Sequence, residues 1–140
     1  MAVTDFETKV AVVVRDDLLP WQRLNVCAFL VSALTAAAGR EAIGEDYVDA
    51  GGERYLPMLR QPVLVFEADA ETIRKAHARA LARAVTLAIY TAELFATGND
   101  EDNRAAVAAV KTDALDLVGI GVRAPHRDTD AVVRGMRRHP

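Results

Sequence analysis

The fold is decided by the stretch KVAVVVRDDLLP, which runs from Lys9 to Pro20. Its five apolar residues, Val10–Val14, are followed at once by three charged ones, Arg15–Asp17. A continuous apolar run of this length, ended by polar residues, is typical of a strand buried on both faces. A long apolar helix is predicted to begin at Pro20. A strand that leads into a buried helix indicates an α/β layered domain, and such domains usually bind ligands at the carboxyl ends of their strands.

A length of 140 residues predicts one domain over residues 1–140, and a content of 51% hydrophobic and 26% charged residues is typical of a soluble globular protein. The net charge of −3 provides no broad attraction to nucleic acid or to anionic membrane, so neither is an expected partner. The longest apolar stretch, Val26–Ala38, falls short of the roughly 20 residues that span a bilayer. We expect a cytoplasmic protein, since Cys27 is the one cysteine and the start carries Asp5 and Glu7 instead of a basic segment.

Local signals predict the remaining elements. The helix from Pro20 should end near Ala38 before Gly39, with Asp17 serving its first N–H groups. Because this helix is apolar nearly all round, we expect it to be buried on more than one side. The last helix should carry Val132 inward and end in basic residues. The other predicted elements are strands at Val63–Phe66, Thr86–Ala92 and Leu115–Val122, and helices after Asp69, after Asn99 and near Asp128. Together they predict a three-layer α/β/α sandwich with a four-stranded mixed sheet.

The segment between the first two long strands is irregular. A tight turn at residues 49–52 is predicted between short strands at Tyr47–Val48 and Tyr55–Leu56. The large apolar residues that follow are too numerous for a free loop, so they either cover the core or contact another subunit. We expect a homodimer with this loop at or near the interface. The candidate interface residues are Tyr55, Leu56, Met58 and Leu59.

Absent motifs exclude several activities. The chain has no G-x-x-x-x-G-K-[ST], no G-x-G-x-x-G after the first strand and no G-x-S-x-G. Its first strand leads into two aspartates, where a phosphate cradle would need glycines. The three histidines share no ligand spacing, and one cysteine cannot build a zinc site. We therefore expect no cofactor and no metal.

Five polar residues near the strand ends are the candidate ligand-binding residues, and no residue is assigned a catalytic role. They are Arg15, Asp16, Asp17, Asn25 and Glu93. If the first two strands are parallel neighbours, these groups border one crevice. The two aspartates either form a carboxylate pair with one raised pKa or serve in capping and in an ion pair with Arg15. Asn25 is either a satisfied core amide or a group aimed at a ligand.

A set of weak motifs in a specific order carries a resemblance to a known family. The motifs are VVRDDL at 13–18, LN at 24–25, YVDAGG at 47–52, TGND at 97–100 and LVGIGV at 117–122. In this order, from residue 8 onward, the chain resembles the bacterial family called domain of unknown function 2000. That family is similar in fold to the type 2 peptidyl-tRNA hydrolases. The resemblance implies a four-stranded mixed sheet between helices, in strand order 2-1-4-3, with one antiparallel strand.

The same resemblance argues against peptidyl-tRNA hydrolysis. The hydrolases begin with a strand followed by Arg-x-Asp-Leu, which matches Arg15, Asp17 and Leu18 here. Their next residue is an essential lysine, and this chain has Leu19. The glutamine and histidine of their first helix fall at Ala28 and Val31, and only Ala92 survives from their motif after the third strand. The hydrolase machinery does not transfer.

The sequence therefore predicts a non-hydrolytic α/β domain that binds a small molecule or a protein partner. The alternative is a hydrolase of altered chemistry, in which a carboxylate among Asp17 and Glu93 is the general base and Asn25 positions the substrate. A third interpretation is a structural subunit of a larger assembly. Whether these side chains converge on one pocket distinguishes the first two.

Overall fold

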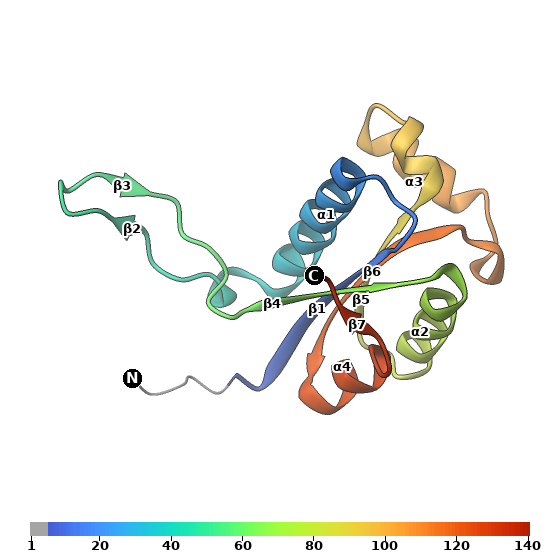
Figure 1. Ribbon diagram of the computed structural model, residues 1–140. Helices are drawn as coiled ribbons and strands as arrows, with labels where there is room; N and C mark the ends of the chain where they lie inside the picture. Colours follow the sequence, from blue (N-terminus) through green and yellow to red (C-terminus); the bar gives the residue numbers. More distant parts are fainter. Residues whose placement is uncertain (1–5) are drawn as a thin grey trace.

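The computed structural model describes residues 6–140, so Asp5 lies outside the described residues. Its main sheet has five strands in the order β5-β6-β1-β4-β7 (Figure 1). Strands β1 and β4 are parallel, β6 is antiparallel to β1 and β5, and β7 is antiparallel to β4. The order of the four long strands agrees with the order that the resemblance implies. Their bounds are β1 (Thr8–Arg15), β4 (Val63–Ala68), β5 (Thr86–Thr91) and β6 (Leu117–Pro125).

The sequence predicted a main sheet of four strands, and the structure has a fifth, a short strand at the edge beside β4. Residues Arg137–Arg138 form β7 and pair with β4, and the N–H of His139 donates to the oxygen of Val65 at 2.9 Å. The last helix, α4 (His126–Val132), ends before the basic residues that were expected to close it. Gly135 adopts a φ of +79°, a left-handed conformation that glycine accepts without steric strain, and the chain turns there toward the sheet edge.

Helices cover both faces of the sheet (Figure 1). Helix α1 (Pro20–Ala38) lies on one face, and α2 (Ala70–Ala82) and α4 pack on the other. Helix α3 (Asp100–Ala108) follows the 3-10 turn η2 (Ala92–Ala96) after β5. Two further 3-10 turns are η1 (Arg40–Ala42) and η3 (Thr112–Ala114). The predicted α/β architecture with a mixed sheet is confirmed.

The central strand separates two apolar clusters, as its sequence predicts. Val10, Val12 and Val14 of β1 face Leu30 and Leu34 of α1. The alternate residues of β1 join the cluster on the opposite face, beneath α2 and α4. A strand places successive side chains on opposite faces, so a run that is apolar at every position requires cover on both.

Helix α1 departs from the expectation of burial on several sides. Only Val26, Leu30 and Leu34 are buried, at intervals of four residues that define one stripe. Trp21, Leu24 and Phe29 are each more than half exposed. The helix packs over β1, β6 and β5 and leaves β4 only partly covered on this face, where Val63 and Val65 are half-buried. Its apolar flanks therefore border hollows in the surface.

Two of the three predicted caps are confirmed. Asp69 accepts from the N–H of Thr72 at 2.8 Å, and Asn99 accepts from the N–H of Asp102 at 2.8 Å. Asp17 does not cap α1, because its carboxylate is held by Arg15. The side chain of Gln22 instead accepts from the N–H of Leu19 at 2.9 Å, which closes the first turn.

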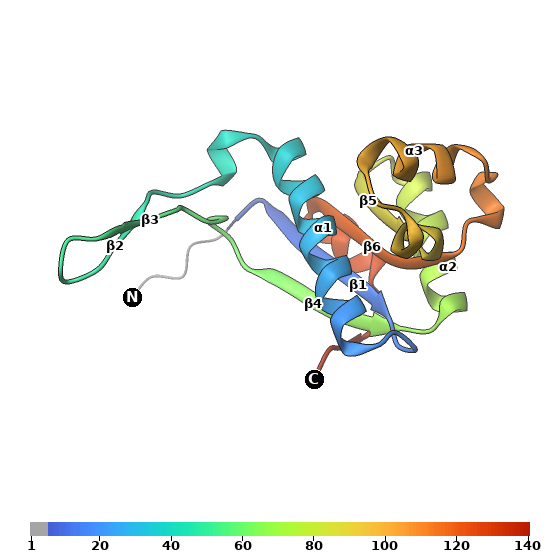
Figure 2. The same ribbon diagram turned by 90° about the horizontal axis from the view of Figure 1, so that it is seen from above.

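The irregular segment forms an arm, residues 46–58, that reaches away from the rest of the molecule (Figures 1 and 2). Its strands β2 (Tyr47–Val48) and β3 (Arg54–Tyr55) pair only with each other. Tyr55, Leu56 and Met58 are exposed, so the option that they cover the core is wrong for these three. Leu59 is half-buried and bridges to Ile43.

Candidate functional site

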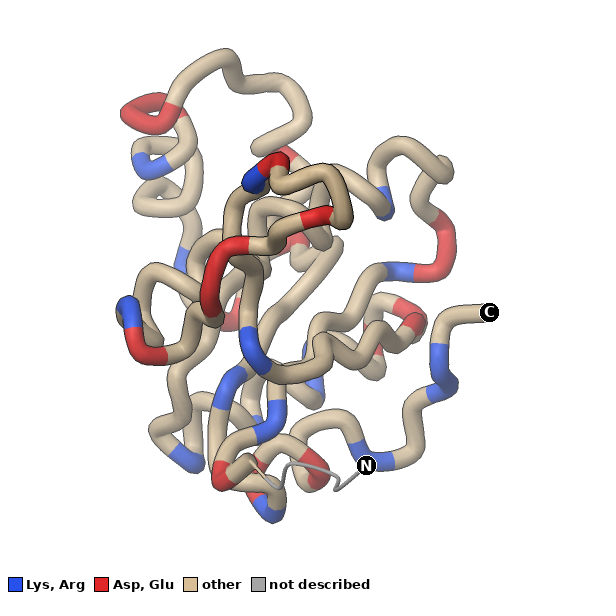
Figure 3. The backbone as a smooth tube through the Cα atoms, turned by 90° about the vertical axis from the view of Figure 1, so that its left-hand side faces the viewer, with Lys and Arg blue, Asp and Glu red and all other residues tan. Residues whose placement is uncertain are grey.

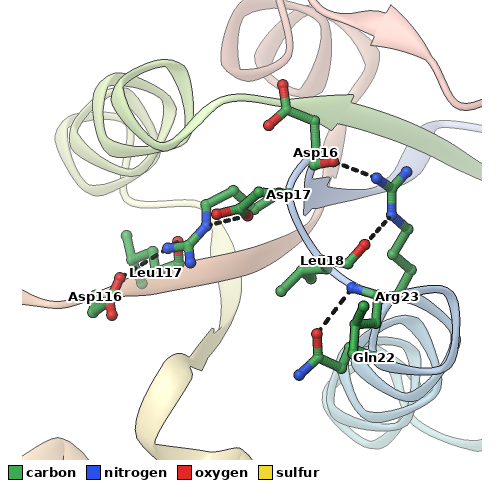
Figure 4. Close-up of polar contacts among 9 residues, drawn as sticks. Asp16, Asp17, Leu18, Gln22, Arg23, Asp116 and Leu117 are labelled. Atoms are coloured by element: carbon green, nitrogen blue, oxygen red, sulfur yellow. Dashed lines mark hydrogen bonds and ion pairs between the residues drawn. The ribbon is translucent and has the colours of Figure 1, made fainter.

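The guanidinium of Arg15 closes the carboxyl end of β1. Its Nε donates to Asp17 at 2.7 Å and its Nη1 donates to Asp116 at 2.8 Å, just before β6 begins (Figure 4). Burial acts to lower the pKa of Arg15, but the hydrogen bonds and charges of Asp17 and Asp116 outweigh it and raise the pKa. The group is thus a charged clamp between two neighbouring strands, with both aspartates as its counter-ions.

The two adjacent aspartates point apart. The carboxylate of Asp16 is exposed and extends away from that of Asp17 (Figure 4). Its main chain is held instead: the N–H donates to Ala68 at 3.0 Å, and the carbonyl accepts from Arg23. Of the two alternatives for these residues, the structure has the ion pair with Arg15 and no carboxylate pair.

The other two candidates lie elsewhere. Asn25 is half-buried on the flank of α1 that faces β5 and α3. Glu93 is exposed on η2 and does not line the pocket that Asn25 borders. Arg15 and Asp17 therefore come together, while Asn25 and Glu93 do not join them. The single crevice expected from the sequence does not form.

A pocket of about 500 Å³ does open close to the carboxyl ends of β1 and β4. It exists because α1 covers β4 only in part, so Val65 lines the pocket while α1 supplies one wall. Leu24, which is 74% exposed, stands at its edge. The volume suits a small organic ligand, and the position is one where open α/β sheets bind ligands. The lining residues are mostly apolar: Val14, Leu18, Pro20, Arg23, Leu24, Cys27, Val65 and His139.

Beside the pocket, a buried carboxylate organises the polar groups. Glu67 of β4 is 6% exposed. Its Oε2 accepts a hydrogen bond from the Nη1 of Arg23 at 3.0 Å. Arg137 of β7 pairs with the other oxygen, Oε1. A buried carboxylate is costly unless it is paired, and here two guanidinium groups neutralise it. The pairing also ties the C-terminal segment to the sheet edge.

The network determines the tautomer of His139. Its Nε2 lies 2.9 Å from the Nη1 of Arg23, and a guanidinium can only donate. The Nε2 must therefore accept, which places the proton on Nδ1, 3.0 Å from the main-chain oxygen of Pro140. His139 itself lines the pocket.

Arg23 keeps one donor for a ligand. Its Nε–H donates to the oxygen of Leu18 at 3.0 Å, Nη1 uses both protons on Glu67 and His139, and Nη2 donates once to Asp16. A guanidinium has five N–H groups, so one Nη2–H has no partner among residues 6–140. The pocket thus combines apolar walls with one charged donor.

Cys27 lines this pocket but is not activated. Burial raises the pKa of its thiol, which keeps it protonated near neutral pH. The candidate residues chosen from the sequence did not include Arg23, Glu67 or His139. The position of Glu67 could have indicated a site residue, because this charged residue directly follows the apolar run Val63–Phe66. No such pattern marks His139, since its place depends on the return of the C-terminal segment.

Two further findings concern residues 6–140. Within this range no three or more His, Cys, Asp or Glu side chains gather as possible metal ligands. No helix in the same range combines the length and the apolar character needed to cross a bilayer.

The fold and the pocket define an α/β protein with a mixed five-stranded sheet and a ligand-sized hollow beside its parallel strands. Residues 8–140 match the family described as Protein of unknown function (DUF2000), and the chain belongs to this family. One similar solved structure is that of Atu0240, a protein of unknown function from Agrobacterium tumefaciens strain C58. It is 42% identical, with a TM-score of 0.93, and the similarity covers 97% of this chain and 100% of that one. None of the curated proteins matches the chain.

Proposed function

We propose that this protein is a non-hydrolytic binding domain that holds a small, largely apolar molecule in the pocket between α1 and β4. The observation that carries the proposal is the pocket of about 500 Å³ with apolar walls and the single remaining donor of Arg23. A ligand with an apolar body and one acceptor group satisfies both. Burial raises the pKa of the Cys27 thiol, and the Nε2 of His139 is engaged by Arg23, so both groups support binding over nucleophilic chemistry.

The proposal extends to fold and setting. The order of the four long strands supports a peptidyl-tRNA hydrolase-like fold, adopted by a single domain over residues 1–140 of a bacterial, cytoplasmic protein. Leu19 stands at the start of α1 where the hydrolases carry lysine. The scattered positions of Asp17, Asn25 and Glu93 weigh against the alternative of an altered hydrolase.

A fluorescent probe with an apolar body and one anionic acceptor, 1-anilinonaphthalene-8-sulfonate, tests the pocket. We expect saturable binding with one site per chain, and displacement by a component of a metabolite extract that mass spectrometry then identifies. Leu24→Glu should abolish binding, because a carboxylate at the pocket edge repels the sulfonate. Leu81→Glu is the matched control, since Leu81 is an exposed leucine on α2. Equal binding by both variants would exclude this pocket.

We also propose that the arm makes the protein a homodimer. An isolated two-stranded hairpin is marginally stable in water, yet this one carries exposed apolar side chains, with Leu56 at 85%. Burying three such side chains contributes about 5–9 kcal/mol of gross hydrophobic free energy, much of it offset by association and ordering. A second copy fits as the partner because residues 45–54 carry four carboxylates and one guanidinium, that of Arg54, whereas arginines lie along the C-terminal segment (Figure 3).

Light scattering at tens of micromolar protein measures this assembly. We expect a dimer for the wild type and a monomer for Tyr55→Ala/Met58→Ala, which removes the two side chains on the arm. Leu81→Ala, on α2, should leave the dimer intact. A monomeric wild type would refute the dimer, and a dimeric double variant would remove the arm from the interface.

A further inference from the structure

A second pocket, of about 380 Å³, lies on the opposite flank of α1. Helix α1 forms one wall, and β5, η2 and the start of α3 form the others. Three residues of α1 face it at intervals of four: Trp21, Asn25 and Phe29. Residues four apart on a helix lie on one face, so an amide stands between two aromatic rings.

Aromatic rings dominate this pocket. Trp21 and Phe95 are 5.8 Å apart between ring centroids, Phe95 and Tyr90 are 5.2 Å apart, and Tyr90 and Phe29 are 5.8 Å apart. The four rings form a continuous chain and make up half of the eight Phe, Trp and Tyr residues in the protein. Trp21 and Phe29 remain more than half exposed. Aromatic rings that only stabilise the core are buried, whereas Trp21 and Phe29 are exposed and line this pocket.

The charge around the pocket is negative. Residues 92–104 contain four carboxylates and one guanidinium, and Asp100 lines the pocket itself. Arg104 holds one oxygen of Asp100, Oδ2. The positive end of α3 is equivalent to about half an elementary charge, which the three acidic residues of its first turn outweigh. An anion would be repelled here.

The amide of Asn25 is free to bind. It is half-buried and forms no side-chain hydrogen bond with any residue between 6 and 140. A core amide would be satisfied by the protein, since a buried polar group without a partner is costly. Its oxygen can accept from an N–H or O–H group of a ligand, and its NH2 group can donate to a ligand oxygen.

We propose that this aromatic pocket binds a small organic ammonium ion. The faces of aromatic rings carry negative electrostatic potential and attract a cation within about 6 Å of their centres. Asp100 supplies a counter-charge at the rim, and Asn25 accepts from a hydroxyl or N–H group of the same molecule. The site shares no lining residue with the pocket between α1 and β4, so a test of one pocket does not decide the other.

Choline and its uncharged carbon isostere, 3,3-dimethylbutan-1-ol, are the probes. Trp21 is the one tryptophan of the chain, so its fluorescence and its indole N–H signal in NMR report on this pocket alone. We expect choline to shift the Trp21 signal saturably and to bind at least about fivefold more tightly than the isostere, which matches it in shape but lacks the charge. Equal affinity of the two probes, or no saturable shift by choline, would overturn the proposal.

Paired variants locate the site. Phe29→Leu keeps an apolar side chain but removes a ring, and we expect choline affinity to fall about fivefold or more. Tyr47→Leu removes an aromatic side chain of similar exposure, 50% against 52%, from the arm and should leave the affinity unchanged. An unchanged affinity in Phe29→Leu, or an equal loss in both variants, would refute a cation site at these rings.

Discussion

Gly119→Ala tests how closely α1 approaches β6. A Cβ at Gly119 would lie 2.5 Å from Cγ1 of Val26, 3.2 Å from Cδ1 of Leu30 and 3.1 Å from the carbonyl oxygen of Val13. Carbon atoms pack optimally at about 3.5–4.0 Å, so the contact with Val26 is roughly 1 Å too short. The oxygen of Val13 belongs to the adjacent strand and cannot move away. We expect a loss of about 3 kcal/mol in the free energy of unfolding, at the upper end for overpacked cores.

Urea unfolding followed by Trp21 fluorescence measures this loss. Gly98→Ala is the matched control, because no atom lies within 4 Å of its added methyl group. Val26→Ala alone should cost about 2 kcal/mol for its two lost methyl groups. Combined with Gly119→Ala, it removes the worst contact, so the double variant should be at least about 1 kcal/mol more stable than the sum of the single effects predicts. Strict additivity, or a Gly119→Ala variant as stable as Gly98→Ala, would refute the reasoning.

Two other predictions concern ionisable groups in the core. Burial lowers the pKa of His77, so the unfolded chain takes up a proton more readily than the folded one. This contribution to stability is present above about pH 6.5 and is lost as the pH falls through the lower pKa of the folded state. His77→Leu should therefore flatten the fall in urea midpoint between about pH 7 and pH 5, and an unchanged slope would contradict this. Glu67→Gln leaves Arg23 and Arg137 facing a neutral amide; we expect a loss of roughly 2 kcal/mol, below the range for fully buried pairs because Arg137 is 75% exposed. Hydrogen exchange should show faster exchange of the His139 amide, and a protected amide would mean that β7 stays docked without Glu67.

Local patterns predicted most of the elements. Helix α1 runs from Pro20 to Ala38 as expected, because a proline at its first position and a glycine after its last act within a few residues. The caps at Asp69 and Asn99 are equally local. The run Val10–Val14 predicted cover on both faces of its strand, and both apolar clusters provide it.

The candidate site was much less predictable. Asp116, which binds Arg15 from the residue before β6, lies 101 residues away in the chain. No pattern near His139 indicates that it returns to β4, because the return depends on a turn at Gly135 and on a carboxylate in a different strand.

Local sequence patterns predicted where most of the strands and helices lie, that the strand Val10–Val14 is covered on both faces, and which catalytic motifs are missing. These depend on residue spacing, on caps and on chain chemistry over a few residues. Long-range packing places Asp17 and Asn25 apart, leaves β4 only partly covered by α1, and sets the two exposed flanks of α1 beside two different pockets. The physical reason is that a pocket is a gap between elements. Its position depends on how a helix crosses a sheet, and here the glycines of β6 admit α1 on one side of that sheet.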